Sequence, residues 1–183
     1  MYKRQGFIEA VLADGGVDIL VNNVGASPSR NFQYMTDEDW HDLHELNLMS
    51  AVRCTRAFLP GMRASGWGRV VMIATGAAFY PGAALIDYAA TKAAMVATGK
   101  ALAGKYGRDG VLVNSVLPGW TITELASGGY ENDRFREVTT RRTPARRWAD
   151  PSEFREVGAF LADPNQTFHT GQEVTVDGGY TVF

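Results

Sequence analysis

Arg69-Val-Val-Met-Ile-Ala-Thr75 is an apolar run that ends in a hydroxyl, and Tyr88-Ala-Ala-Thr-Lys92 follows it after a glycine-rich loop. A short apolar run with β-branched residues is typical of a strand that is buried on both faces, as in a parallel sheet. Three further runs have the same character and alternate with helical patterns: 18–25, 111–119 and 171–179. This alternation predicts an α/β fold with helices on both faces of a parallel sheet.

Tyr88 and Lys92 are four residues apart, so a helix would place them on one face. A free phenol has a pKa of about 10 and is a poor acid–base group at neutral pH. A nearby ammonium stabilises the phenolate, and we therefore expect Lys92 to lower the pKa of Tyr88. This is what general acid–base catalysis on an alcohol or a carbonyl requires. The pair alone is equally consistent with an amphipathic helix that has a buried Tyr and a solvated Lys.

The helices are predicted from periodicity and capping signals. Gly15-Gly16 ends a first helix over 5–14, and Thr36-Asp-Glu-Asp39 predicts a capping box that opens a long helix over 37–64. The helix that carries Tyr88 is expected to continue to about residue 106. The strand that follows it leads into a stretch, 119–149, that we expect to be irregular. Asp150-Pro-Ser-Glu predicts the start of a last helix.

The composition indicates one domain over 1–183 and excludes several classes of function. The chain has a formal net charge of −2 and 45% hydrophobic residues, which gives no sign of a nucleic-acid partner. The single cysteine, Cys54, cannot form an internal disulfide. No apolar run has the length of about eighteen residues that a membrane span needs, and no secretory signal is visible. We expect a cytoplasmic protein without a membrane span, and no metal site is predicted.

The four apolar runs and the Tyr–Lys pair, in this order and spacing, closely resemble the compact single-domain branch of the short-chain dehydrogenase/reductase family. The resemblance covers about residues 7–180. It implies a Rossmann-like, doubly wound parallel sheet and an oxidoreductase that uses NAD or NADP to interconvert a secondary alcohol and a ketone. Carbonyl reduction of the 3-oxoacyl or sugar-acid type is typical of such proteins. The expected partner is a small-molecule carbonyl or alcohol substrate.

The same resemblance assigns the site residues. Tyr88 exchanges a proton with the substrate oxygen, and Lys92 assists it and binds the nicotinamide ribose. Thr75 stands where the family usually has Ser, and its hydroxyl can orient the substrate oxygen in the same way. Asn47 holds a water that continues a proton relay from the lysine. The residues implied in cofactor binding, besides Tyr88 and Lys92, are Asn22, Asn23, Gly25, Pro118, Gly119, Thr121 and Thr123.

One expected part of the family's fold is absent from the sequence. No Gly-x-Gly-x-x-Gly pattern follows a strand, and the first recognisable strand, 18–24, corresponds to the family's fourth. We therefore expect a partial domain that lacks the first three strands and the glycine-rich loop, with strand 18–24 left as an open edge. Met1-Tyr-Lys-Arg-Gln5, read as codons, resembles the end of a sequencing adapter, and these five residues are expected not to be native. The choice between NAD and NADP cannot be read.

Two alternatives to an NAD(P)-dependent oxidoreductase stay open. The first is a non-catalytic, truncated oligomerisation module that cannot hold cofactor. The second is the sugar-nucleotide epimerase branch, which also uses a Tyr-x-x-x-Lys pair.

A homo-oligomer is expected, with helices 37–64 and 86–106 in the interface, because the second of these helices is rich in Ala and Gly. Five aromatic residues that flank the motifs either line an apolar pocket or pack a lid: Phe79, Tyr80, Trp120, Tyr130 and Trp148.

Overall fold

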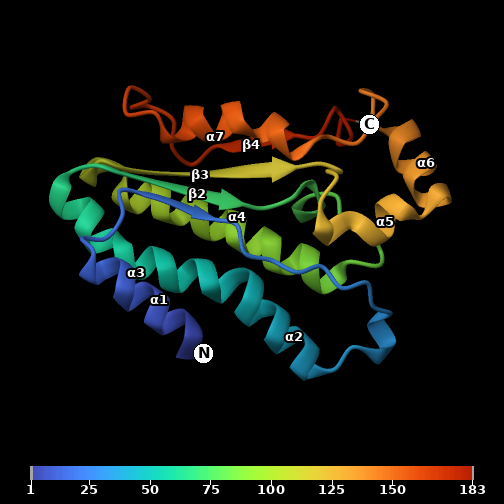
Figure 1. Cartoon of the computed structure of the whole chain (residues 1–183), viewed down its shortest axis with the longest axis horizontal. Coiled ribbons are helices and arrows are strands. Elements are labelled where there is room, and N and C mark those ends of the chain that lie inside the picture. Colours follow the sequence, from blue (N-terminus) through green and yellow to red (C-terminus); the bar gives the residue numbers. More distant parts are fainter. Residues whose placement is uncertain (1, 183) are drawn as a thin grey trace.

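The computed structural model describes residues 2–182, and the side chains of residues 6–182. The hypothesis that residues 1–5 are not native falls on residues whose side chains are outside the described part of the chain. The centre of the fold is a four-stranded sheet in the order β1-β2-β3-β4, with every neighbouring pair parallel (Figure 1). The strands span Ile19–Asn22 (β1), Gly68–Ile73 (β2), Val111–Pro118 (β3) and Glu173–Val176 (β4). The predicted α/β class and parallel sheet are confirmed.

The two central strands bury both faces. In β2, Val70 and Met72 pack into the main core, whereas Val71 between them packs with Val116 and Leu161 on the opposite face. Successive side chains of a strand point to opposite faces, so the apolar run of β2 supplies two cores at once.

Helices cover both faces of the sheet. In Figure 1, α1, α3 and α4 lie along one face, and α7 lies along the other. The helices span Tyr2–Ala13 (α1), Asp37–His44 (α2), Ser50–Ser65 (α3), Ile86–Tyr106 (α4) and Arg155–Ala162 (α7). The predicted helix over 86–106 is confirmed, and so is the capping box at Thr36. The predicted helix start at Asp150 is also confirmed, and the structure adds a capping box there, with Glu153. Within residues 2–182, none of the helices combines the length and hydrophobicity that spanning a bilayer requires.

The predicted helix over 37–64 is continuous but contains a wider turn. A five-residue π-helix, Glu45–Met49 (η2), joins α2 to α3. Single π turns inside α-helices occur frequently at functional sites. Here the π turn contains Asn47, which is the residue that the family resemblance marks.

The expectation of an irregular stretch over 119–149 is wrong. This stretch contains Ser127–Glu131 (α5) and Asp133–Arg142 (α6). Both helices lie beyond the carboxyl end of the sheet (Figure 1). The physical reason for the error is that α6 is strongly polar and Thr139 is its one buried residue, so it shows no apolar stripe from which a helix could be predicted.

Strand β1 forms one edge of the described sheet, because β2 is its only partner there. Ile19 is 43% exposed and Val21 is 54% exposed. An apolar strand with a free edge presents unpaired backbone groups to other chains. The predicted open edge is therefore present in the described part of the chain.

Candidate active site

Tyr88 and Thr75 meet at the carboxyl end of β2. Tyr88 lies in the first turn of α4, where its side chain is only 8% exposed. Its phenol lies near enough to the hydroxyl of Thr75, which follows β2 by two residues, for that hydroxyl to affect its pKa. The Thr75 oxygen also accepts the backbone N–H of Ala77 at 3.3 Å. The two predicted hydroxyl groups are therefore neighbours at this end of the sheet.

The pKa of Tyr88 moves in the direction opposite to the prediction. Burial raises the pKa of the phenol above 10.0, and the Thr75 hydroxyl lowers it by a smaller amount. The Lys92 ammonium lies 6.0 Å from the centre of the Tyr88 ring. Loss of hydration disfavours the phenolate and outweighs the other effects here. The phenol is thus held in its protonated form at neutral pH.

Lys92 lies one turn further along α4 and is 4% exposed. Its ammonium donates a hydrogen bond to the carbonyl oxygen of Ile73, with an Nζ to O distance of 2.8 Å. Burial lowers the pKa of Lys92 from 10.5 to about 8. An ammonium has three N–H donors, and Ile73 O is the acceptor it uses within the described residues. Two donors are therefore available for a ligand.

Asn47 is fully buried in the π-helix and connects two segments. Its Oδ1 accepts the N–H of Ala26 at 2.9 Å, and its Nδ2 donates to the Ala26 carbonyl at 3.0 Å. The same amide donates to the hydroxyl of Thr91 at 3.1 Å, and Thr91 in turn donates to the Tyr88 carbonyl. Asn47 thus ties the segment after β1 to the turn that carries Tyr88. The water that the resemblance implies stays a prediction.

Gly25 lies against both Lys92 and Asn47. A side chain added at this position would have its Cβ 3.3 Å from Lys92 Nζ and 3.5 Å from Asn47 Oδ1. A residue without a side chain therefore lets the backbone approach the ammonium closely. The structure brings together Gly25, Asn47, Lys92 and, through α4, Tyr88.

The two asparagines at the end of β1 have different environments. Asn22 is buried, and its Nδ2 donates to the Thr55 hydroxyl at 3.2 Å and to the Met72 sulfur at 3.4 Å. It therefore braces β1 against α3 and β2. Asn23 is exposed at the carboxyl edge of the sheet, where open α/β sheets bind ligands.

The segment after β3 forms a neighbouring part of the same edge. Gly119 donates its N–H to the Val176 carbonyl at 3.0 Å, and a Cβ at this position would lie 2.6 Å from the Asp177 Cα. Only glycine allows this close approach of β3 and β4. The Thr121 hydroxyl donates to the Gly119 carbonyl at 3.0 Å, whereas Thr123 is exposed. A Cβ at Gly76 would lie 4.0 Å from the Pro118 oxygen, so this segment approaches the one that carries Thr75.

Three of the five flanking aromatic residues pack together within residues 119–149, the segment that contains α5 and α6 and that we call the lid. Trp120 stacks on Trp148 with ring centres 5.1 Å apart, and Tyr130 lies 5.3 Å from Trp148. The Trp148 indole also donates to the Thr139 hydroxyl at 2.9 Å. Phe135 joins this cluster, edge-on to Trp120. By contrast, Phe79 and Tyr80 are exposed beside the site.

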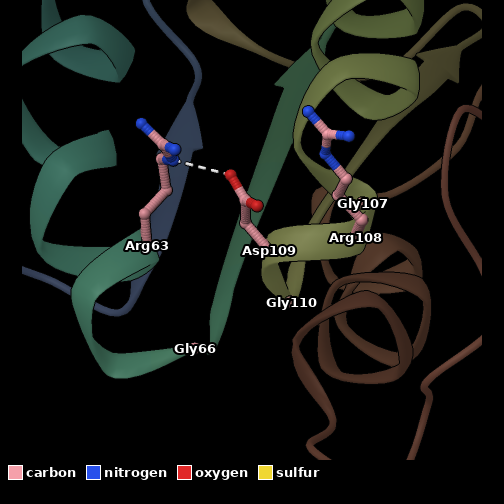
Figure 2. Close-up of a pocket in the computed structure, with 6 residues that line it drawn as sticks. All are labelled: Arg63, Gly66, Gly107, Arg108, Asp109 and Gly110. Carbon is pink, nitrogen blue, oxygen red and sulfur yellow. Dashed lines mark hydrogen bonds and ion pairs between the residues drawn. The ribbon is translucent and has the colours of Figure 1, made fainter.

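Two of the open grooves on the described surface can be compared with the position of the candidate site. A groove of about 720 Å³ begins at Gly25 and Ala26, and its walls are formed by Leu43 and Leu46 of the α2–η2 helix and by Leu125 of the lid. Figure 2 shows the second groove, of about 470 Å³, where Arg63 pairs with Asp109 at 2.7 Å. Its lining residues precede β2 and β3, so it lies at the opposite end of the sheet. Of these two grooves, the first adjoins the candidate site.

Two charged residues that the sequence analysis did not single out also belong to this region. Arg30, in the segment after β1, pairs with Asp87, the residue before Tyr88. Their charges are 57 positions apart in the chain, so no local pattern predicts the contact. Within residues 2–182, no cluster of three or more His, Cys, Asp or Glu is placed to bind a metal ion.

The geometry is that of the dinucleotide-dependent α/β oxidoreductases, and comparisons with known proteins agree. A family model described as enoyl-(acyl carrier protein) reductase matches residues 4–181. The 3-oxoacyl-(acyl-carrier-protein) reductase FabG of Vibrio cholerae is 37% identical over 177 residues, which cover 94% of this chain and 72% of that protein. Oxidoreductase UcpA of Escherichia coli is 37% identical, with coverage of 92% and 67%. The chain belongs to the short-chain dehydrogenase/reductase family.

Solved structures show the same fold. A gluconate 5-dehydrogenase from Burkholderia cenocepacia, in complex with NADP and tartrate, matches with a TM-score of 0.94 and 31% identity over 98% of this chain. L-sorbose reductase from Gluconobacter frateurii, complexed with NADPH and L-sorbose, matches with a TM-score of 0.89 and 33% identity. The chain covers 71% and 73% of these two structures. It therefore spans about seven-tenths of the length of such relatives, and the Rossmann-like fold is confirmed for that part.

Proposed function

We propose that this chain carries the catalytic half of an NAD(P)-dependent oxidoreductase that interconverts a secondary alcohol and a ketone. The observation that supports this most directly is the buried Tyr88 phenol beside the Thr75 hydroxyl, with the Lys92 ammonium 6.0 Å from the centre of the Tyr88 ring. In the reducing direction, the Tyr88 hydroxyl donates its proton to the substrate oxygen while the Thr75 hydroxyl orients that oxygen. The phenol is protonated at neutral pH and so holds the proton to be transferred, whereas its raised pKa makes it a weaker acid and is unfavourable for that transfer.

The residues around Lys92 suit a nicotinamide dinucleotide. The two unused N–H donors of Lys92 match a pair of ribose hydroxyls, and the bare backbone of Gly25 allows a ligand to approach them. Bound here, the cofactor would supply or accept the hydride. Asn23 and Thr123 are exposed at the same sheet edge and can contact it, and Pro118, Gly119 and Thr121 form the segment that would face the nicotinamide.

The substrates named for the relatives define a first panel of carbonyl compounds. A 3-oxoacyl thioester, 5-ketogluconate and L-sorbose represent the 3-oxoacyl, sugar-acid and sugar types. The test is spectrophotometric turnover of NADPH and of NADH with each compound, in the parent chain and in Tyr88→Phe. We expect Tyr88→Phe to lose at least about 100-fold in rate, the usual contribution of a positioned acid.

A matched control separates loss of the acid from loss of a tyrosine. Tyr34 is 75% exposed, so Tyr34→Phe should leave turnover unchanged. If the parent turns over substrate and Tyr88→Phe does so at a similar rate, the assigned role of the phenol is wrong.

A second candidate function is a non-catalytic module that keeps the site but does not hold cofactor. The observation that favours it is the absence from the sequence of a glycine-rich turn after a strand, because such a turn and the helix that follows it bind the pyrophosphate. Equilibrium titration with NADPH and NADH distinguishes the two. Micromolar binding supports the enzyme, whereas no binding up to millimolar cofactor supports the module.

We also propose that the protein is a homo-oligomer. Ala97 and Ala101 are exposed on α4, and small side chains there allow a second helix to pack closely. Light scattering at micromolar concentration tests this, since a monomer mass would contradict it.

A further inference from the structure

Arg30 is held between two carboxylates that come from different helices. Its Nη1 lies 3.2 Å from Asp87 Oδ2, and its Nη2 lies 3.2 Å from Asp39 Oδ1. The Asp87 side chain is fully buried, whereas those of Arg30 and Asp39 are about one-third exposed. A buried carboxylate needs a counter-charge or hydrogen bonds to stay ionised at low cost. Arg30 supplies the counter-charge for Asp87.

Asp87 in turn holds the backbone of Tyr88. Its Oδ1 accepts the N–H of Tyr88 at 2.8 Å. Helix α4 begins after Leu85, which offers no side-chain cap, and the first N–H groups of a helix have no partner inside the helix. Asp87 satisfies one of these groups, and its negative charge is favourable at a helix N-terminus. The first turn of α4 is thus fixed by Asp87 in place of a capping residue.

The opposite side of the same turn is tied to the segment that carries Arg30. The Tyr88 carbonyl accepts from Thr91, Thr91 accepts from Asn47, and Asn47 is doubly hydrogen-bonded to Ala26. The segment after β1 therefore contacts the Tyr88 backbone through two separate chains of bonds. One chain runs through Asn47, and the other runs through Arg30 and Asp87.

We propose that Arg30 is a positioning residue that fixes Tyr88 through Asp87. This assignment rests on the proposed function only in that Tyr88 is the reacting acid. The ion pair holds Asp87 in the orientation that receives the Tyr88 N–H, and so holds the phenol against Thr75. Within the described residues, Arg30 bonds to Asp39, to Asp87 and to the Ala84 carbonyl, and not to the side chains of Tyr88 or Thr75.

Amide hydrogen exchange measured by NMR tests the proposal without any turnover. In Arg30→Met, we expect the Tyr88 amide to exchange at least about tenfold faster, the effect of losing a hydrogen bond to a charged group. Amides in the second half of α4, residues 97–106, should keep their parent rates. Arg63→Gln removes the Arg63–Asp109 pair at the other end of the molecule and should leave the Tyr88 amide unchanged.

A double variant addresses the risk that Arg30→Met unfolds the chain by leaving a charge buried. Arg30→Met combined with Asp87→Asn removes both charges, so the folding penalty is largely relieved. We expect this variant to fold but still to exchange faster at Tyr88, whereas Arg30→Lys should recover part of the protection. Parent-like exchange at Tyr88 in both Met variants, or an equal rise along all of α4, would overturn the proposal.

The activity measurement keeps the two proposals apart. Where the parent turns over substrate, Arg30→Met should lower kcat and leave the KM for cofactor unchanged. A parent without turnover counts against the proposed function alone, because the exchange result at Tyr88 still decides the role of Arg30.

Discussion

The burial of Lys92 predicts an unusual dependence of stability on pH. Its pKa is lowered from 10.5 to about 8 by loss of hydration, so the folded state holds this proton less tightly than the unfolded state does. Below pH 8 both states carry the proton, and the folded state bears the full cost of the buried charge. Between pH 8 and 10.5 the unfolded state binds more protons, so the free energy of unfolding rises with pH.

The size of the effect follows from the two pKa values. The fall from 10.5 to about 8 corresponds to about 3 kcal/mol at most. Water penetration reduces such penalties in real proteins, and we expect at least about 1 kcal/mol to be observed. Replacing Lys92 with Met removes the titrating group. As the pH rises from 7 to 10.5, the free energy of unfolding of the lysine protein should therefore increase by this amount relative to that of the Met protein.

The measurement is urea unfolding at several pH values from 7 to 10.5. It is made in the Tyr88→Phe background, because the raised pKa of Tyr88 contributes stability that is lost as pH rises above 10. Lys105→Met, at an exposed position of the same helix, is the matched control. If the difference in free energy of unfolding between the lysine and Met proteins stays constant from pH 7 to 10.5, Lys92 is hydrated in solution and the reasoning is refuted.

Three further predictions follow from packing and exposure. Trp148→Ala should lower the free energy of unfolding by about 3–5 kcal/mol, because Trp148 is the centre of the lid's aromatic cluster; a loss under about 1 kcal/mol in thermal denaturation would contradict this packing. Ala97→Glu should shift the light-scattering mass toward the monomer, and an unchanged oligomer would rule out this face of α4 as the interface. Val21→Lys should reduce turbidity on concentration, since charge on an exposed strand edge opposes pairing with other chains; aggregation equal to that of the parent would remove the edge as its cause.

The fold could be predicted largely because its decisive elements carry strong local signals. The run of β2 from Val70 to Ile73 is wholly apolar, and the run of β3 is interrupted only by Asn114 and Ser115. Thr36 forms the capping box that its sequence indicates, and Asp150 opens the last helical segment. Helix α6 could not be predicted in this way. Phe135 and Val138 are its only apolar residues, and the contacts that hold it in place, from Phe135 to Trp120 and from Thr139 to Trp148, are tertiary.

The site could be predicted where a residue type and its spacing imply chemistry. Gly25, Asn47, Lys92 and Tyr88 lie together as the motif order suggests. The direction of the Tyr88 pKa could not be predicted, because it depends on how completely the folded chain removes water from the phenol. The contact of Arg30 was also not predictable, since it links a loop to a helix that no sequence pattern relates to it.

The π-helix at Glu45–Met49 limits which insertions and deletions this chain can accept. Each residue of an α-helix rotates the following chain by about 100°, and a π turn is equivalent to one residue inserted into that rotation. Deleting one residue within 45–49 would restore a regular α-helix with α2 and α3 in about their present relative rotation, but it would remove the wide turn that carries Asn47. Deleting one residue early in α3 would instead rotate the preceding helix by about 100°, so that Leu43 would leave the core and Asp39 would leave Arg30. Length variation is therefore better tolerated in the loop before Thr36, outside the helix, than anywhere between Asp37 and Ser65.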